Sequence, residues 1–305
     1  MGLQKGQSLA LKRRYGEKSV ETLLFFSAII SILAMLMIFY FLLMESVHAF
    51  SAIGIFGLIS GTRWNAATDT YGMLPLIVNS LLVTILALII NMAIGIPLAI
   101  YMAELAGPTT RTWLKPAIEL LAGVPSIVYG FLGVLILVSY LQDTFQMLTG
   151  RSILAGSMLL GIMFIPSITT ICEDALRAVP SEFKEGSLAL GANQWQTIRH
   201  VTIPAASSGI TAAILLNIGR IIGETMAVLL VVGNVARIPT PIFDVFDRGA
   251  TFTSIIASEM GEVPHGSLHY YTLFAVGLVL LVLVSLMSVI ADLIRERIQR
   301  KFGGY

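Results

Sequence analysis

LPLIVNSLLVTILALIINMAIGIPLAIYM, residues 74–102, contains no charged side chain. About 20 residues of α-helix cross the hydrocarbon core of a bilayer, so this stretch is long enough to span a membrane. Apolar residues occupy every face of such a helix, whereas a helix in the core of a soluble protein has one apolar and one polar face. We therefore interpret residues 74–102 as a transmembrane helix.

Five other stretches have the same apolar character, and the whole chain agrees with them. Its 305 residues are 56% hydrophobic and 12% charged, with a mean hydropathy of +0.86, whereas soluble domains carry about 25% charged residues. The sequence predicts an all-α membrane protein with six transmembrane helices. The predicted spans are residues 22–44, 74–102, 117–141, 153–172, 205–233 and 270–292.

The basic residues indicate how these spans are oriented. If the N-terminus is cytoplasmic, 14 of the 19 Lys and Arg residues lie on the cytoplasmic side, four lie outside, and Arg220 lies within a span. This bias follows the positive-inside rule and predicts that both termini are cytoplasmic. The chain then divides into a cytoplasmic tail (1–21), a transmembrane domain (22–292) and a second cytoplasmic tail (293–305). The net charge of +1 requires no nucleic-acid partner.

Two long external segments, residues 45–73 and 234–269, are rich in turn-forming residues, and we expect ordered loops or short helices that cover the outer face. His265 and His269 have the four-residue spacing of a helical metal pair, but no third ligand is evident. We predict loop histidines and no metal site, with metal binding as the weaker alternative. The single cysteine excludes an internal disulfide.

The cytoplasmic segment VPSEFKEGSLALGANQWQTIRHVTIP, residues 179–204, contains signals for two short helices. Ser181 is expected to be the N-cap of a helix that runs to Leu190. Gly191 follows, and glycine accepts the left-handed conformation that commonly ends a helix. The sequence therefore predicts a tight bend at Gly191.

A second helix is expected to begin at Asn193, because Gln196 stands three residues further on in a capping-box arrangement. We expect it to end before Pro204, since proline interrupts helical hydrogen bonding. Together the two helices would form a hairpin that projects from the cytoplasmic face of the membrane.

The spacing within this hairpin resembles the EAA loop of ABC importer permeases, E-A-A-x3-G-x9-I-x-L-P. The resemblance implies a type I importer (MetI-like) architecture in which the loop docks on a separate ATPase subunit. Gly186-Ser187 stand in place of Ala-Ala, which keeps the residues small although glycine inside a helix costs about 1 kcal/mol relative to alanine. The residues that match the pattern or replace its small members are Glu185, Gly186, Ser187, Gly191 and Pro204.

The chain carries no nucleotide-binding motif of its own. No glycine is followed directly by lysine, so a Walker A loop, GxxxxGK[ST], is absent from the sequence. We therefore expect a transport subunit that is not itself an enzyme and binds no cofactor, with ATP and Mg²⁺ bound by the partner ATPase. An ion-gradient-driven carrier or channel that works alone is the alternative from a different class.

Two ionisable residues lie inside the predicted fifth span, in GRIIGETMAVLLVVGN, residues 219–234. Charged side chains inside a membrane cost at least about 2.5 kcal/mol each and usually face a pathway or a partner. Arg220 and Glu224 are four residues apart, so on a helix their side chains share a face and can meet. A self-paired ion bridge that only holds helices together is the alternative. Gly219 and Gly223 form a GxxxG pair, which indicates close helix packing.

This stretch resembles the fifth-span sequence of phosphate ABC permeases of the PstC type, A-R-x-x-G-E-T-M-A-V followed by V-x-G-N. Residues 120–134 and 64–82 resemble other parts of the same family. The PstA-type sister subunit has Ala-Pro after G-E-T, whereas Met226-Ala227 stand here. The resemblance implies that Arg220 and Glu224 take part in phosphate passage. It also implies a multi-pass protein of a prokaryotic cell membrane, surrounded by lipid, with three protein partners: an ATP-binding subunit, a PstA-type permease and an extracytoplasmic phosphate-binding protein.

The chemistry of these side chains suits an oxyanion. A guanidinium presents a planar fork of donors that matches two oxygens of a tetrahedral anion. Phosphate at neutral pH keeps an O–H that Glu224 could accept, whereas sulfate has none, so we hypothesise that Glu224 tunes Arg220 and selects protonated oxyanions. Asn217 and Thr225 are also predicted to lie along the pathway. An ABC permease for sulfate or molybdate remains the alternative.

Overall fold

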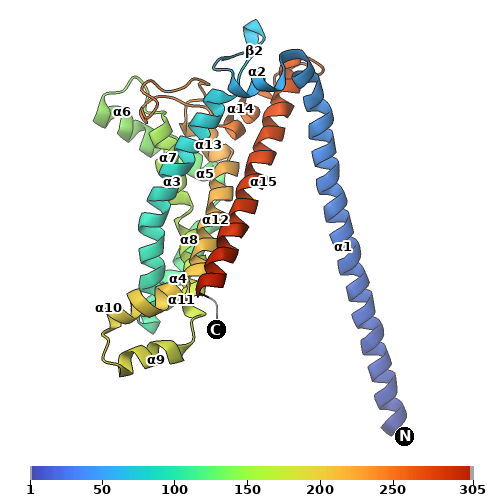
Figure 1. The fold of residues 1–305 in the computed structure, drawn as a ribbon, viewed down its shortest axis with the longest axis vertical. Helices are drawn as coiled ribbons and strands as arrows, with labels where there is room; N and C mark the ends of the chain where they lie inside the picture. The colour runs from blue at the N-terminus through green and yellow to red at the C-terminus, as the bar shows by residue number, and fades with distance from the viewer. Residues whose placement is uncertain (1, 303–305) are drawn as a thin grey trace.

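The computed structural model describes residues 2–302, whose regular secondary structure consists of helices and one short β-hairpin, joined by loops (Figure 1). The outer hairpin pairs β1 (Trp64–Asn65) with β2 (Thr70–Tyr71) and encloses the 3₁₀ turn η1 (Ala66–Thr68). The helices before residue 150 are α1 (Gly2–Ile53), α2 (Ile55–Ser60), α3 (Leu74–Ile100), α4 (Pro108–Ala122), α5 (Ser126–Leu132) and α6 (Ser139–Phe145). Those after it are α7 (Ile153–Met163), α8 (Ile165–Arg177), α9 (Ser181–Ala189), α10 (Gln194–Thr197), α11 (Ile203–Ala205), α12 (Ser207–Gly223), α13 (Met226–Val231), α14 (Phe252–Glu259) and α15 (Leu268–Phe302). Three π turns lie between helices: η2 (Tyr101–Leu105), η3 (Gly133–Val138) and η4 (Ile198–Thr202).

Within the described residues, five helical segments are long and apolar enough to cross a membrane. A sixth span exists if the bent pair Gln194–Ala205 and Ser207–Gly223, which meet at 67°, is taken as one. The prediction of an all-α membrane protein with six spans is thereby confirmed. The five unbent spans are Val20–Ile53, Leu74–Leu105, Ser126–Phe145, Ile153–Arg177 and Leu268–Ile290.

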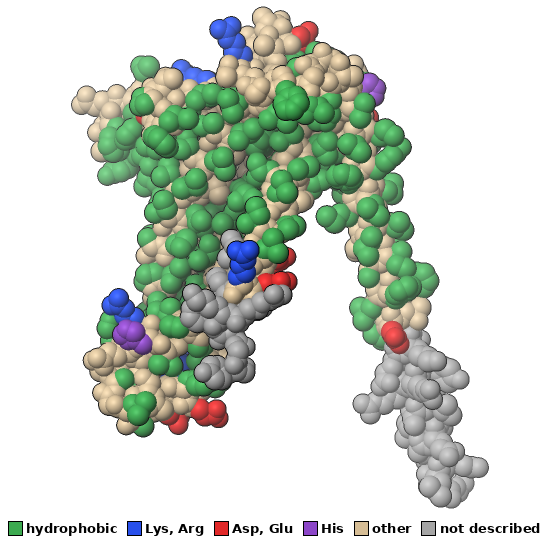
Figure 2. Space-filling model, viewed as in Figure 1, with side chains coloured by type: hydrophobic (Ala, Val, Ile, Leu, Met, Phe, Trp, Pro, Cys, Tyr) green, Lys and Arg blue, Asp and Glu red, His purple; other side chains and the backbone are tan. Residues whose placement is uncertain are grey.

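The surface agrees with this assignment. Figure 2 shows hydrophobic side chains over the middle of the molecule, and charged side chains gathered toward its two ends. In Figure 1 the N-terminal end of α1 and the C-terminal end of α15 point toward the end of the bundle that carries α9 and α10, while β2, α2 and α14 lie at the opposite end. The described residues of the two predicted tails, 1–21 and 293–305, are helical and belong to α1 and α15. Met1 and residues 303–305 lie outside the described part.

Helix α3 packs against α7, α8 and α12. Small residues allow this close packing: a Cβ atom added to Gly161 of α7 would lie 2.8 Å from side-chain atoms of Ile90 on α3. Helix α1 packs on α15 near the outer end, where the rings of His48 and Tyr271 stack at a centroid distance of 4.4 Å.

The third span differs from the predicted range 117–141. Helix α4 ends at Ala122, and a new helix begins at Ser126 after a break that contains Gly123 and Pro125. Proline lacks a backbone N–H and disfavours helical geometry at the residue before it, so a continuous helix through this point would be destabilised. Residues 117–122 therefore belong to a separate helix, and the span is Ser126–Phe145.

The external segments contain short elements, as predicted: α2 and the β-hairpin in residues 45–73, and α14 in residues 234–269. The prediction that His269 lies in a loop is wrong, because His269 is in the first turn of α15. Its Nε2 atom lies 2.7 Å from Oε2 of Glu259, and Trp64 Nε1 donates to the same carboxylate at 3.1 Å. His265 precedes α15, so His265 and His269 do not lie one turn apart on a helix.

Candidate transport site and coupling hairpin

The fifth span is broken where its two charged residues lie. Helix α12 ends at Gly223, and Glu224 is extended, with φ −68° and ψ 129°. Its backbone carbonyl accepts a 2.7 Å hydrogen bond from Thr253 Oγ1, and its Oε1 atom accepts from the backbone N–H of Ala227 at 3.2 Å. Helix α13 then begins at Met226. Non-helical backbone inside a membrane occurs where protein or a water-filled cavity satisfies its polar groups, and broken helices of this kind often form binding sites in transporters.

Arg220 lies in the last turn of α12 and is exposed. Its Nη1 atom donates to Ser167 Oγ of α8 at 2.8 Å. The predicted contact with Glu224 is wrong: within the described residues these two side chains form no ion pair with each other. Four-residue spacing brings side chains together only along a continuous helix, and the extended backbone at Glu224 ends that helix.

The other two predicted pathway residues differ in their surroundings. Thr225 is half-buried beside the break, and its Oγ1 atom donates to the Gly223 carbonyl at 3.2 Å. Asn217 is fully buried, and its Nδ2 atom donates to Ala213 O at 2.8 Å. The structure therefore brings Arg220, Glu224 and Thr225 together around the break. Asn217 faces the interior of the bundle instead.

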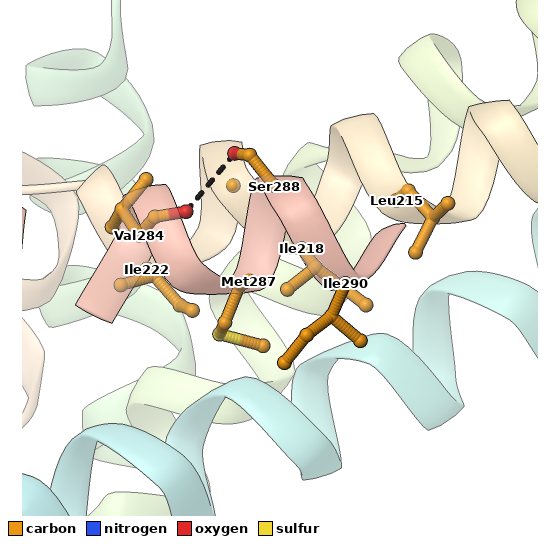
Figure 3. Close-up of a pocket in the computed structure, with 8 residues that line it drawn as sticks. Leu215, Ile218, Ile222, Val284, Met287, Ser288 and Ile290 are labelled. Atoms are coloured by element: carbon orange, nitrogen blue, oxygen red, sulfur yellow. Dashed lines mark hydrogen bonds between the residues drawn. The ribbon is translucent and has the colours of Figure 1, made fainter. Parts of the chain in front are cut away.

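The glycine pair of α12 does not pack against another helix of this chain. A Cβ atom added to either Gly219 or Gly223 would meet nothing within 4 Å among the described residues, so these glycines do not provide close helix packing within this chain. Gly219 lines an apolar groove between α12 and α15 (Figure 3). The only hydroxyl among the groove's lining residues, that of Ser288, donates to Val284 O at 2.9 Å. This groove carries no charge that could hold an oxyanion.

The coupling hairpin, α9 to α10, has the bend that the sequence predicts. Gly191 has φ +88°, in the left-handed region, and Asn193 and Gln196 form the predicted capping box. Ser187 Oγ of α9 lies 3.0 Å from Thr197 Oγ1 of α10, which joins the two helices. The helix begins one residue earlier than predicted, because Ser181 is its first residue and Pro180 occupies the cap position.

The prediction that the second helix ends before Pro204 is wrong. Helical backbone continues from α10 through the π turn η4 and α11 to Ala205. Pro204 stands near the start of α11, directly after the π turn η4. The chain changes direction at Ala206, between α11 and α12.

Apolar side chains are exposed on this hairpin, at the end of the molecule where water is expected. Leu190 is 91% exposed, Trp195 59% and Phe183 50%, and Glu185 is exposed beside them. A Cβ atom at Gly186 would meet nothing within 4 Å. Exposed apolar groups in one place indicate a protein-docking surface.

Sequence reasoning missed an ion cluster that joins α4 to α8. Glu173 is fully buried, and its Oε1 atom lies 2.7 Å from Nη2 of Arg111. Lys115 Nζ lies 3.3 Å from Oε2 of Glu173 and 3.4 Å from Oδ1 of Asp174. Partial burial alone would lower the pKa of Lys115, but its hydrogen bond to Glu173 and the nearby carboxylate charges outweigh this and raise the pKa. The only signal in the sequence was an acidic pair directly after an apolar run.

Replacing Gly191 tests the hairpin bend. Because a side chain there would meet nothing within 4 Å, the cost of Gly191→Ala is the left-handed backbone itself, about 1–2 kcal/mol. Gly191→Asn should cost less, since asparagine enters this region more readily. We expect thermal unfolding midpoints in the order Gly, Asn, Ala, from highest to lowest. Equal midpoints for the two variants would contradict the assigned conformation.

Comparison with known proteins identifies the family. The model for the binding-protein-dependent transport system inner membrane component matches residues 95–302. The chain belongs to this family of membrane permeases. The permease is 40% identical over 275 residues to the probable ABC transporter permease protein YqgH of Bacillus subtilis, with 88% of each chain covered. It is 35% identical over 275 residues to the phosphate transport system permease protein PstC of Mesorhizobium japonicum, covering 84% of this chain and 83% of that one.

Solved structures show the same fold at low sequence identity. A bacterial alginate ABC transporter, in complex with an alginate pentasaccharide-bound periplasmic protein, matches with a TM-score of 0.63 at 16% identity, covering 90% of this chain and 94% of that chain. The MetNI methionine ABC transporter in inward-facing conformations matches with a TM-score of 0.58 at 19% identity, covering 74% and 97%. The expected resemblance to PstC-type permeases and the MetI-like architecture are both confirmed. The permease is an inner-membrane transport component.

Proposed function

We propose that this permease is a transmembrane subunit of an ATP-driven importer of inorganic phosphate. The observation that carries the proposal is the exposed Arg220, which lies in the last helical turn before the break in the fifth span. A guanidinium that faced hydrocarbon would be costly, so this face of α12 requires water or another protein against it. The PstC relative of Mesorhizobium japonicum supports phosphate as the substrate.

Partner subunits follow from the same proposal. A PstA-type sister permease completes the pathway beside the uncovered face of α12, where Gly219 and Gly223 leave room for close approach. A separate ATPase, which binds ATP and Mg²⁺, docks on the exposed residues of the coupling hairpin. An extracytoplasmic phosphate-binding protein delivers phosphate to the outer face formed by residues 45–73 and 234–269.

Glu224 gives the pathway a means to distinguish phosphate from sulfate. Its carboxylate already accepts a hydrogen bond from the Ala227 N–H, and its second oxygen can accept a hydrogen bond from an O–H of phosphate. Sulfate has no proton to donate at neutral pH and would place its charge against the carboxylate. The carboxylate therefore disfavours the fully deprotonated anion.

Replacing Glu224 with glutamine tests this selectivity. The amide oxygen can still accept from the Ala227 N–H, so the break is retained while the charge is lost. One charge-assisted hydrogen bond is worth about 1.5–3 kcal/mol, so we expect phosphate uptake to fall by roughly 10-fold or more. Discrimination against sulfate should narrow at the same time. Competition uptake with labelled phosphate and sulfate measures both, and an unchanged rate with an unchanged ratio would contradict the role of Glu224.

The proposed function itself is tested by reconstitution. The permease is purified with its co-expressed partner subunits and placed in liposomes, with ATP inside the vesicles opposite the delivery protein. We expect phosphate uptake that requires both ATP and the delivery protein. Uptake of sulfate or molybdate in place of phosphate would reassign the substrate. Transport by this chain alone without ATP would instead favour an ion-coupled carrier.

A further inference from the structure

Glu104 lies at the inner end of α3, in the π turn η2. Its Oε1 atom lies 2.7 Å from Nζ of Lys184 on α9, and the two side chains are only 10% and 24% exposed. Removal from water strengthens such a pair relative to one on an open surface. This ion pair therefore fastens the first helix of the coupling hairpin to the end of α3.

The same residue also holds the second helix of the hairpin. The backbone carbonyl of Glu104 accepts a 3.1 Å hydrogen bond from Nε2 of Gln194, the first residue of α10. The Ser187–Thr197 contact closes the hairpin between its two helices. A single residue of η2, the π turn that continues α3, is thus bonded to both helices of the hairpin.

At its outer end, α3 is bonded to the elements that hold the break in the fifth span. Ser80 Oγ accepts from the backbone N–H of Phe252 at 3.1 Å, where α14 begins. The next residue, Thr253, donates to the Glu224 carbonyl. A continuous set of contacts therefore runs from the hairpin along α3 to Glu224. The covalent route from the hairpin to the same point passes through the 67° bend before α12, which transmits an axial displacement less directly.

We propose that Glu104 is a positioning residue that makes α3 and the coupling hairpin move as one body. Displacement of the hairpin by the ATPase then reaches the outer end of α3 and, through α14, the break that carries Glu224. This inference rests on the proposed function, because it requires an ATPase that acts on the hairpin. Packed side chains, ion pairs and rigid helices of this kind carry energetic coupling between distant sites.

The first test measures phosphate taken up per ATP hydrolysed in the reconstituted complex. Glu104→Gln keeps the size of the side chain and the backbone bond to Gln194 but removes the ion pair. Coupling changes of this kind span about 2- to 30-fold, and we expect a loss of about 10-fold with ATP hydrolysis retained. The combined change Glu104→Lys with Lys184→Glu should restore the ratio. Glu119→Gln, at an exposed glutamate of α4, is the matched control and should leave the ratio unchanged.

A second test does not depend on the substrate. Spin labels on cysteines introduced at the exposed Ile89 of α3 and Ser181 of α9 report the distance between these helices, and the native Cys172 is buried. In the wild-type complex we expect the same distance with and without ATP, and in Glu104→Gln a distance that changes on ATP binding. An ATP-dependent distance in the wild type, or full coupling in Glu104→Gln, overturns the inference. A distance that is constant in the wild type and changes with ATP in Glu104→Gln supports the inference. This holds even if the complex transports another anion, because that result would contradict only the proposed substrate.

Discussion

Replacing Arg220 with alanine is expected to lower ATP-driven phosphate uptake by roughly 100-fold or more. Two charge-assisted hydrogen bonds from a guanidinium fork to an oxyanion are each worth about 1.5–3 kcal/mol, and alanine removes both. Arg220→Lys keeps the charge but offers no planar fork, so we expect a smaller loss. Initial uptake rates in proteoliposomes at matched protein content measure both variants.

Two controls separate a pathway role from a structural one. Arg151→Ala removes an exposed arginine on the outer side of the membrane and should leave uptake near the wild-type rate. Ser167→Ala removes the hydroxyl that Arg220 contacts and leaves the guanidinium in place, so its effect should be modest. If Arg220 only joined α12 to α8, Arg220→Ala and Ser167→Ala would have similar effects. That result, or wild-type uptake by Arg220→Ala, would contradict the proposal.

The membrane spans could be predicted from the sequence because the bilayer imposes a length and a hydropathy that do not depend on the rest of the fold. The hairpin bend was equally predictable, since Gly191 and the Asn193–Gln196 box act through local backbone geometry. Each of these features is decided within about one turn of helix or by one uninterrupted apolar run. Local rules are therefore sufficient for them.

The break at Glu224 could not be predicted in the same way. It depends on Thr253, which is 29 residues away in the sequence and donates to the Glu224 carbonyl. The break at Pro125 did have a local signal, a glycine and a proline within three residues, but the apolar character of residues 117–141 concealed it. Hydropathy indicates which residues lie in a membrane and does not indicate where the helix inside it is interrupted.

The contacts of the charged residues could not be predicted from the sequence either. Arg220 bonds to Ser167 of another helix, and Glu104 to Lys184 of the hairpin, and neither pair has a helical spacing that would reveal it. The spacing of Arg220 and Glu224 indicated a pair that the structure does not contain. Long-range pairs are set by how helices pack, which depends on small residues such as Gly161 at their contacts.

Replacing the fully buried Glu173 with alanine is expected to destabilise the permease more than the loss of any surface ion pair. Its carboxylate holds both Arg111 and Lys115 of α4 against α8, and Arg177 lies at 4.0 Å. Removing one partner of a buried pair costs about 3–5 kcal/mol because the remaining charges lose their counterion. Since the two α4 cations are 28% and 29% exposed, we expect about 3 kcal/mol, the lower limit of that range. A loss of this size lowers the thermal unfolding midpoint by about 6–12 °C.

Asp174→Ala provides the matched control, because it removes the same charge from the adjacent residue. Asp174 is 63% exposed, and among the described residues its one ion pair is with Lys115, at 3.4 Å. An exposed pair of this kind contributes about 0–1 kcal/mol, so the midpoint should shift by no more than about 2 °C. Similar shifts in the two variants would show that burial of Glu173 does not decide the effect. A large shift in Glu173→Ala alone would instead establish that α4, which the sequence assigned in part to a membrane span, is fixed to α8 by this single carboxylate.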